Sequence, residues 1–183
     1  MEVGLAGKTK TSYMYLDLDS EIISKAKDIK LLLTDCDGVL TDAGVYYSNE
    51  GEELKRFSHR DGMGVERLRK LANIETGIIT GENSNIVNKR ARKLGINECH
   101  CGIGDKYSKF LEIIERKKIH PLQVAYIGDD TNDLELMKHV GISACPADAF
   151  SRIIEIADIV VDNKGGHGAF RDFAELLIEC RLK

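Results

Sequence analysis

Three short apolar runs in this chain each end in a cluster of polar residues, and this pattern constrains the fold more than any other feature. The runs cover residues 29–34, 74–80 and 124–127, and stretches with helical spacing of apolar residues separate them. Parallel strands covered by helices on both faces appear in a sequence as short apolar runs of this kind. The alternation of strands and helices therefore predicts an α/β protein with a Rossmann-like parallel sheet and helices on both of its faces.

The remaining pattern fills in the other elements of one domain. We expect residues 1–28 to form an N-terminal extension with a mobile tail and a short helix, and residues 29–183 to form the domain. The further predicted elements are a short helix at 21–27, a β-hairpin at 45–57, helices at 64–71, 86–94, 106–117 and 134–140, a strand at 159–161 and a closing helix at 169–180.

Composition excludes several classes of protein. The chain has 183 residues, which is about one domain on the usual scale of ~100–200 residues. No apolar run approaches the ~20 residues that a membrane helix needs. The net charge of −4 and the absence of a basic stripe argue against a dedicated nucleic-acid binder. We therefore expect no membrane and no nucleic-acid partner.

The cysteines and the N-terminus favour a cytoplasmic location. The five cysteines are odd in number and show no C-x-x-C spacing, so a secreted disulfide scaffold is not expected. The first residues lack the apolar segment of a signal peptide. Cys99-His100-Cys101 could suggest a metal site, but no second cluster supplies the remaining ligands. We interpret this segment as a short strand.

Polar residues at the ends of the predicted strands form a candidate site. Asp35 and Asp37 follow the first run, Thr80 ends the second, and Asp129 and Asp130 follow the third. In open parallel sheets, ligands bind beyond the carboxyl ends of the strands, so these side chains should meet at one edge. Converging carboxylates repel one another unless a cation neutralises them, and oxygen ligands suit Mg²⁺.

The same residue types can perform phosphoryl transfer. A metal, a hydroxyl at Thr80 and an ammonium at Lys106 would bind a phosphate beside an aspartate. A carboxylate can attack phosphorus and form an aspartyl phosphate, which splits hydrolysis into two steps. A second aspartate can protonate the leaving alcohol and then activate water.

Four motifs resemble those of the haloacid dehalogenase superfamily. They are Asp35-Cys36-Asp37-Gly38-Val39, Thr80-Gly81, Lys106 and Gly128-Asp129-Asp130-x-x-Asp133. The resemblance implies that Asp35 is the nucleophile, that Asp37 is the general acid/base, and that Thr80 and Lys106 bind the phosphoryl group. It further implies that Asp35, the backbone carbonyl of Asp37 and Asp129 bind Mg²⁺. Asp130 and Asp133 would support these ligands.

The spacing of the motifs leaves no room for a separate cap domain. Only 43 residues separate Asp37 from Thr80, and only 26 separate Thr80 from Lys106. A small substrate would then need a lid from a neighbouring subunit, whereas an open site would also admit a protein substrate. The hairpin at 45–57 carries three aromatic residues on a piece too small to bury them, so it is a candidate subunit contact.

From residue 29 to about 177 the chain resembles the capless 3-deoxy-D-manno-octulosonate 8-phosphate phosphatases. The similar stretches are residues 31–65, 79–96, 124–143 and 163–177. The resemblance implies a homotetramer in which the hairpins meet centrally and a neighbour's Gly-rich segment reaches the active site. It also implies substrate contacts from Ser58, His59, Arg60, Asp61, Gly62 and Arg90.

Glu82 departs from that family's pattern. The family usually has arginine after the Thr-Gly motif, and a second arginine position there is Glu66 here. Losing an arginine removes a bidentate partner for the sugar carboxylate. Glu82 together with Lys93 resembles the branch that dephosphorylates 2-keto-3-deoxy-D-glycero-D-galacto-nononate 9-phosphate or N-acylneuraminate 9-phosphate, the sialic acid precursor.

Three hypotheses follow for the function. The favoured one is a Mg²⁺-dependent phosphatase for such a nine-carbon substrate. The alternative is the eight-carbon phosphatase of lipopolysaccharide biosynthesis. A non-catalytic oligomeric scaffold is the second alternative, although a binding-only domain has no need for both Asp35 and Asp37. His167, in the Gly-rich segment, stands where the family often has arginine, which weakens that segment's predicted contact with substrate.

Overall fold

The computed structural model describes residues 20–182 of the chain. The helix predicted at residues 21–27 is present as α2 (Ser20–Asp28). The predicted mobile tail lies outside the described residues.

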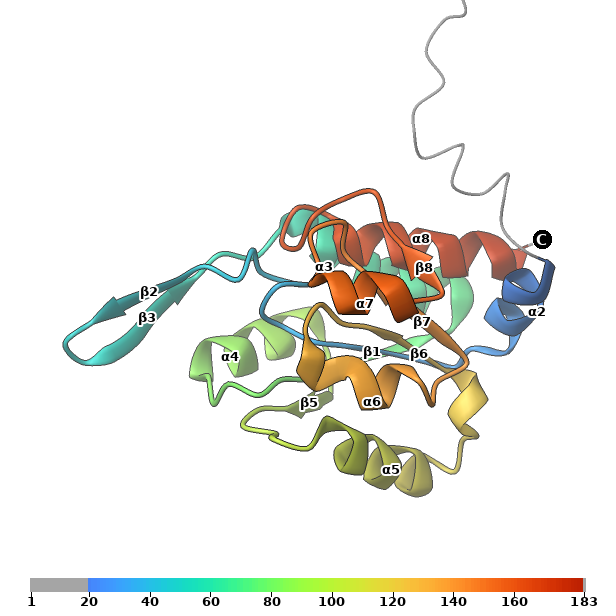
Figure 1. Cartoon of the computed structure of the whole chain (residues 1–183), viewed down its shortest axis with the longest axis horizontal. Helices are drawn as coiled ribbons and strands as arrows, with labels where there is room; N and C mark the ends of the chain where they lie inside the picture. Colours follow the sequence, from blue (N-terminus) through green and yellow to red (C-terminus); the bar gives the residue numbers. More distant parts are fainter. Residues whose placement is uncertain (1–19, 183) are drawn as a thin grey trace, which may run out of the picture.

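A six-stranded parallel sheet forms the centre of the molecule, as the apolar runs predict (Figure 1). Its spatial order is β5-β4-β1-β6-β7-β8, and every neighbouring pair is parallel. The strands are β1 (Leu31–Thr34), β4 (Glu75–Ile79), β5 (Glu98–His100), β6 (Val124–Ile127), β7 (Ile142–Cys145) and β8 (Ile159–Val160). Because β1 lies between β4 and β6, the three motif-bearing strand ends are adjacent.

Helices cover both faces of the sheet, and each face has its own apolar core. One core joins the sheet to α2, α3 (His59–Arg67), α4 (Asn85–Leu94) and α8 (Ala169–Leu182). The other core joins it to α5 (Lys106–Lys117), α6 (Leu134–Met137) and α7 (Ser151–Ile156). The buried strands β1 and β6 contribute alternate residues to the two cores, as expected for a central parallel strand. This arrangement confirms the predicted Rossmann-like fold.

Several element boundaries differ from the sequence prediction. The helix expected at 64–71 begins at His59, because the Ser58 side chain caps it by accepting a hydrogen bond from the backbone N–H of Arg60 (3.1 Å). It continues into a π-helical turn (η1, Leu68–Ala72) and ends at Asn73, whose φ is 53°. Strand β7 and helix α7 were not predicted, because both are short and lack a clear apolar period.

The predicted hairpin is a separate two-stranded antiparallel sheet made of β2 (Val45–Ser48) and β3 (Gly51–Lys55). It projects from the body of the molecule, and none of the described residues forms a cap domain above the site (Figure 1).

Two 3₁₀ turns, η2 (Pro121–Gln123) and η3 (Thr131–Asp133), complete the fold. Within residues 20–182, no helix has the length and apolar character needed to cross a membrane.

Candidate active site

Asp35 lies directly after β1 and faces Lys106, the first residue of α5. The Asp35 backbone N–H donates to the carbonyl of Ile127 (3.0 Å), which extends the pairing of β1 with β6. Lys106 Nζ is 2.9 Å from Asp35 Oδ1, and the Lys106 side chain is fully buried. Burial lowers the pKa of Lys106, but the charges of Asp35 and Asp133 outweigh this and raise it above its ordinary value. Lys106 therefore provides a fixed positive charge beside Asp35.

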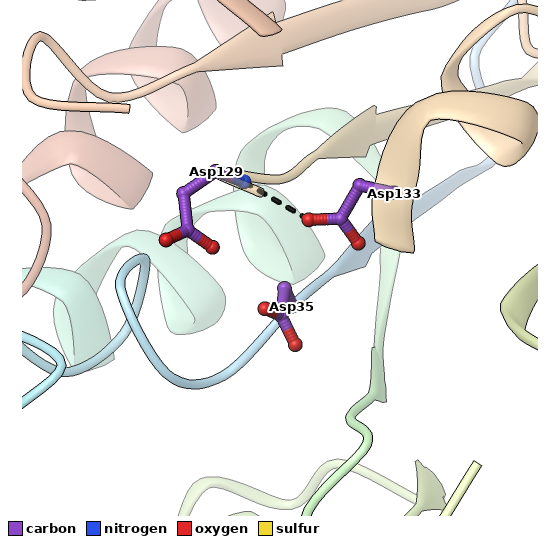
Figure 2. Close-up of side chains that lie close together, drawn as sticks. All are labelled: Asp35, Asp129 and Asp133. Carbon is purple, nitrogen blue, oxygen red and sulfur yellow. Dashed lines mark hydrogen bonds between the residues drawn. The ribbon is translucent and has the colours of Figure 1, made fainter. Parts of the chain in front are cut away.

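A second carboxylate, Asp129, follows β6 and faces Asp35 (Figure 2). Asp35, Asp129 and Asp133 each place one oxygen within 4.8 Å of the others, and no other such group of His, Cys, Asp or Glu was found among residues 20–182. Burial raises the pKa of Asp129, and the charges of Asp35 and Asp133 raise it further. The pKa of Asp35 is also raised by burial, although Lys106 partly offsets this. Three carboxylates at this distance need positive charge to remain ionised.

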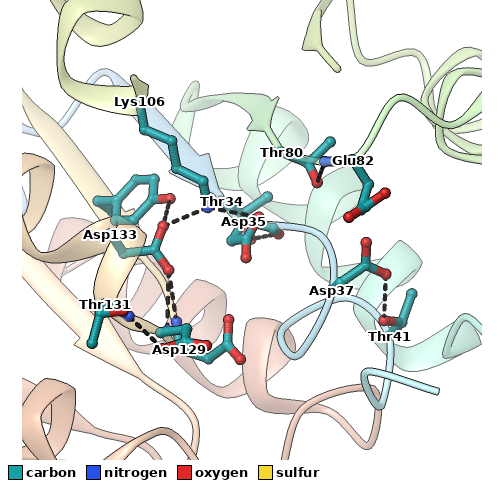
Figure 3. A network of polar contacts seen from close by, with 12 residues as sticks. Thr34, Asp35, Asp37, Thr41, Thr80, Glu82, Lys106, Asp129, Thr131 and Asp133 are labelled. Atoms are coloured by element: carbon teal, nitrogen blue, oxygen red, sulfur yellow. Dashed lines mark hydrogen bonds and ion pairs between the residues drawn. The ribbon is translucent and has the colours of Figure 1, made fainter. Parts of the chain in front are cut away.

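Asp133 uses both of its carboxylate oxygens within the protein. Its Oδ1 accepts from Lys106 Nζ (2.6 Å) and from the Tyr126 hydroxyl (2.5 Å). Its Oδ2 accepts from the backbone N–H groups of Asp129 (3.0 Å) and Asp130 (3.3 Å). Figure 3 shows this network. Asp133 thus orders the loop that presents Asp129.

The residues present fit a magnesium ion. Among the described residues, Asp129 Oδ1 is a buried oxygen without a hydrogen-bond partner. A buried, unpartnered carboxylate oxygen is costly unless a cation or another donor satisfies it. The nearby Asp35 carboxylate supplies a second hard oxygen, and Mg²⁺ prefers one or two protein carboxylates with the remaining positions open to water and phosphate.

Gly38 allows the loop after β1 to approach Asp129. Its φ is +89°, in the region that favours glycine. A Cβ at this position would overlap the Asp129 carboxylate, lying only 2.9 Å from even the farther of its oxygens, Oδ1. Gly38 is therefore the residue type that the site geometry requires.

Asp37 and Thr80 lie at the same edge of the sheet (Figure 3). Asp37 Oδ1 accepts from the Thr41 hydroxyl (3.1 Å), and Asp37 Oδ2 is 2.7 Å from Lys55 Nζ. Thr80 follows β4 and is 1% exposed. A hollow of about 260 Å³ is lined by Asp35, Asp37, Thr80, Glu82, Asp129 and Asn132, among others. Residues of three of the four motifs thus line one solvent-accessible hollow, and the buried Lys106 of the fourth motif contacts Asp35.

A larger hollow of about 660 Å³ lies elsewhere, around Arg69, Thr76, Glu98 and Arg116. None of the four motifs reaches it. The cationic side chain of Arg116 is paired with Glu98 at 2.5 Å. The chemistry therefore favours the smaller hollow as the active site.

Most predicted substrate contacts lie outside the small hollow in this single chain. Glu82 is the one that lines it, and the others are Ser58, His59, Arg60, Asp61, Gly62, Arg90 and Lys93. Arg90 Nη2 donates to the carbonyl of Ser58 (3.0 Å), and its guanidinium lies 5.5 Å from the centre of the Phe57 ring. Arg90 thus holds the loop that precedes α3.

Asp61, one of the predicted substrate contacts, is buried between two helices. It is 2% exposed, and its Oδ1 accepts from the backbone N–H of Arg171 (2.9 Å). Burial raises its pKa to about 6. This carboxylate ties α3 to α8 instead of facing the hollow, because it belongs to the buried side of the helix that Ser58 caps.

The Gly-rich segment packs against its own chain, and its predicted contact with a neighbour's site stays a prediction because one chain is described. The Gly166 N–H donates to the carbonyl of Val39 (2.9 Å), and Arg56 Nη2 donates to the carbonyl of Gly166 (3.2 Å). A Cβ at Gly165 would overlap the Gly38 carbonyl oxygen. His167 stands where the family often has arginine. Its Nε2 lies 2.9 Å from Arg56 Nη2.

Cys99 and Cys101 are partly buried free thiols on and beside the edge strand β5. Their sulfur atoms lie 3.7 and 3.8 Å from Asn88 Oδ1. The interpretation of this segment as a short strand is confirmed.

The sequence reasoning missed Lys55, Tyr126 and Thr41. Tyr126 looks like an ordinary apolar strand residue, and Lys55 looks like a surface charge on a hairpin. No spacing signal in the sequence connects Lys55 to Asp37. A hydroxyl inside a fully buried strand, as at Tyr126, is the one signal that could have prompted a search for a partner.

Comparisons with known proteins agree with this geometry. The sequence profile of the haloacid dehalogenase-like hydrolases matches residues 65–171, more than half of the chain. The 3-deoxy-D-manno-octulosonate 8-phosphate phosphatase of Escherichia coli (strain K12) is 42% identical over 169 residues, which cover 92% of this chain and 89% of that protein.

Solved structures show the same relationship. The Yersinia pestis 3-deoxy-D-manno-octulosonate 8-phosphate phosphatase superposes with a TM-score of 0.87 at 38% identity, covering 91% of this chain and 89% of that one. The Moraxella catarrhalis enzyme, solved with magnesium, phosphate and KDO, superposes with a TM-score of 0.86 at 34% identity, covering 90% of this chain and 94% of that one.

The magnesium prediction is thus confirmed at the level of the family. The chain is a phosphoric monoester hydrolase that belongs to the haloacid dehalogenase superfamily and, within it, to the family of the capless 3-deoxy-D-manno-octulosonate 8-phosphate phosphatases.

Proposed function

We propose that this chain hydrolyses the phosphate monoester of a 2-keto-3-deoxy sugar acid through an aspartyl-phosphate intermediate. The observation that carries this proposal is the arrangement of Asp35 between Lys106 and Asp129, at the open edge of the sheet. Lys106 supplies positive charge where a phosphoryl group would approach Asp35. Thr80 lines the same hollow and offers a hydroxyl to the phosphoryl oxygens.

The reaction proceeds in two steps. A carboxylate oxygen of Asp35 attacks phosphorus, the bond between phosphorus and the sugar oxygen breaks, and Asp37 protonates that oxygen. Asp37 then takes a proton from a water molecule, which attacks the phosphorus atom. The bond from phosphorus to Asp35 breaks, releasing inorganic phosphate and restoring the carboxylate.

Asp35, Asp129 and the backbone carbonyl of Asp37 would hold the magnesium ion. When bound, Mg²⁺ neutralises carboxylate and phosphate charge and orients the phosphoryl group. Asp133 keeps the loop of Asp129 in place through its two backbone acceptor contacts.

The first candidate substrate is 3-deoxy-D-manno-octulosonate 8-phosphate. Glu82 and Lys93 led us to expect a nine-carbon substrate, whereas relatives that are 42% and 38% identical to this chain are named for the eight-carbon one. Glu82 is the observation that keeps a nonulosonate 9-phosphate as the second candidate, because its exposed carboxylate lines the hollow beside Asp35. A carboxylate at this position can accept hydrogen bonds from the hydroxyl groups of a longer polyol chain.

We further propose a homotetramer in which the hairpins form part of the subunit contact. Tyr46 and Tyr47 are each 67% exposed, and Leu54 is 62% exposed, on a hairpin that projects away from the core (Figure 1). Exposed apolar side chains concentrated on one projection are typical of an interaction surface. Sedimentation analysis tests this, and a stable monomer would contradict it. A cytoplasmic location remains a prediction from the sequence.

The decisive experiment compares kcat/KM for the eight-carbon 8-phosphate and the two nine-carbon 9-phosphates with Mg²⁺ present. Asp35→Asn should abolish turnover of each, because the amide is not a nucleophile. Asp28→Asn, at an exposed position on α2, is the matched control and should keep wild-type rates. Near-normal turnover by Asp35→Asn would overturn the mechanism, and no hydrolysis of any phosphate monoester by the wild type would favour the scaffold hypothesis.

A further inference from the structure

Lys55 is a buried cation on an otherwise exposed hairpin. Its side chain is 2% exposed, whereas the preceding residue on β3, Leu54, is 62% exposed. Alternate side chains of a strand point to opposite faces, so Lys55 points back toward the body of the molecule. Burying an unpaired ammonium group lowers the stability of the folded protein, so the partners of Lys55 indicate its role.

The first partner of Lys55 is Asp37. Lys55 Nζ lies 2.7 Å from Asp37 Oδ2, and the Thr41 hydroxyl donates to the other oxygen, Oδ1, at 3.1 Å. Each carboxylate oxygen thus has one donor on the protein side. Two donors on different oxygens fix both the position and the plane of the carboxylate, while each oxygen keeps a further lone pair for other contacts.

The second partner of Lys55 is Glu52, three residues earlier on β3. Lys55 Nζ is 3.0 Å from Glu52 Oε2, and the other oxygen of Glu52 accepts from the Ser84 hydroxyl. Ser84 caps α4, four residues after Thr80. The contacts therefore run from Asp37 through the base of the hairpin to the segment that follows Thr80.

We propose that Lys55 is a positioning residue for the acid/base Asp37, so that the base of the hairpin orients the group that transfers the proton. This inference rests on the proposed function, because it assigns a role within that reaction. A general acid acts only when its oxygen lies within hydrogen-bonding reach of the leaving oxygen. Groups that orient a functional residue typically change activity by about 10–100-fold when they are removed.

A purely structural role for the same ion pair predicts different kinetics. If Lys55 only stabilised the hairpin, its loss would lower the rates for all substrates alike. If it orients Asp37, its loss should slow the release of poor leaving groups, which need a proton. Release of a good leaving group such as p-nitrophenolate should be unaffected, since that group departs without one.

The test uses Lys55→Met, Lys55→Arg and the control Lys27→Met, which removes the charge of an exposed lysine on α2. For the sugar-acid phosphate, Lys55→Met should lower kcat by about 10–100-fold with KM changed by less than about threefold. The rate of the p-nitrophenol burst from p-nitrophenyl phosphate should stay within about threefold of the wild type, because the burst reports the first step alone. Lys55→Arg keeps the charge and should recover part of the lost kcat, and Lys27→Met should match the wild type.

A double-mutant cycle separates action through Asp37 from any other effect. In an Asp37→Asn background, adding Lys55→Met should change the rate for the sugar-acid phosphate by less than about twofold, since the group that Lys55 positions is already lost. Additive losses would overturn the proposal, as would equal losses of Lys55→Met on both substrates. If Lys55→Met fails to fold, Lys55→Arg is compared with the wild type instead. A lower kcat for the sugar-acid phosphate with an unchanged p-nitrophenol burst supports the proposal, and equal losses on both substrates overturn it.

Failure of this inference is distinguishable from failure of the proposed function. A wild-type protein that hydrolyses neither substrate refutes the proposed function. A wild-type protein that hydrolyses both, with a Lys55→Met variant that matches it on both, refutes the positioning role and leaves the proposed function standing.

Discussion

The hydroxyl of Tyr126 donates a 2.5 Å hydrogen bond to Oδ1 of Asp133, and both side chains are completely buried. This contact joins the interior of β6 to the turn that carries Asp129, so the strand itself helps to orient a candidate metal ligand. Burial raises the pKa of Tyr126 well above its ordinary value, and the charge of Asp133 raises it further, so the phenol stays protonated and can donate.

Tyr126→Phe should therefore weaken both folding and metal binding. The variant loses a hydrogen bond to a charged acceptor, which costs about 1.5–3 kcal/mol of the free energy of unfolding. Its affinity for Mg²⁺ should fall by about tenfold, as is typical when a group that orients a ligand is lost. Urea denaturation and calorimetric Mg²⁺ titration measure the two effects. Tyr107→Phe, which removes a hydroxyl from a half-buried ring on α5, is the control, and equal losses in both variants would contradict this interpretation.

Gly38→Ala should disrupt the metal site through the loop after β1, whereas Tyr126→Phe acts through β6. A methyl group there overlaps the carboxylate of Asp129, and the +89° φ is itself strained for alanine. We expect at least a tenfold loss of Mg²⁺ affinity and a parallel fall in kcat/KM. Gly104→Ala is the matched control, since a Cβ at Gly104 meets no other atom within 4 Å. Unchanged Mg²⁺ binding in Gly38→Ala would show that the loop can move without affecting the site.

The buried carboxylate of Asp61 should make stability depend on pH. Its pKa is raised to about 6 in the folded chain by burial, from an ordinary value of 3.8. Between about pH 4 and pH 6 the folded state binds the extra proton, so the contribution of Asp61 to the free energy of unfolding falls as pH rises. About two pKa units correspond to at most about 3 kcal/mol at pH 7.

Asp61→Asn should remove this dependence. The difference in the free energy of unfolding between variant and wild type should shift in favour of the variant, by up to about 3 kcal/mol, from pH 4 to pH 7. Urea denaturation at several pH values measures it, with Asp28→Asn as the matched loss of an exposed carboxylate. A pH-independent difference would mean that Asp61 titrates alike in the folded and unfolded chains.

Glu82→Arg tests which substrate the site prefers. An arginine at this place on the wall of the hollow can pair with a sugar-acid carboxylate but loses the acceptor that Glu82 offers to the longer polyol chain of a nine-carbon substrate. We expect the ratio of kcat/KM for the eight-carbon over the nine-carbon substrate to rise by about tenfold, the equivalent of about 1.4 kcal/mol. An unaltered ratio would remove Glu82 as a determinant of specificity.

The sheet and the catalytic edge were predictable because local chemistry determines them. The run Leu31–Thr34 is buried on both faces, and Asp35 comes directly after it, so strand and site residue are visible together in the sequence. The pairing of β1 with β6 was predictable only from the fold class, because these strands are far apart in the sequence. The short strand Ile142–Cys145 was missed because four residues between a glycine and a proline carry too little pattern.

The predictions about the substrate loop were weaker because they depend on side-chain direction. Ser58 begins a helix, and this local event turns Asp61 toward α8 and away from the hollow. The pairing of Lys55 with Asp37 joins residues 18 positions apart through a hairpin that folds back on itself. Such contacts arise from tertiary packing, which no period of apolar residues encodes.

The order of the strands also determines when the chain can become an enzyme. During synthesis Asp35 leaves the ribosome early, yet the strand that brings Asp129 beside it, β6, comes about ninety residues later and docks directly on β1. A nascent chain that ends before residue 124 has Asp35, the proposed nucleophile, but lacks the neighbouring strand, Asp129 and Asp133. Phosphoryl chemistry therefore begins only once the second half of the sheet has been made and has docked, so partly synthesised chains carry an inert aspartate.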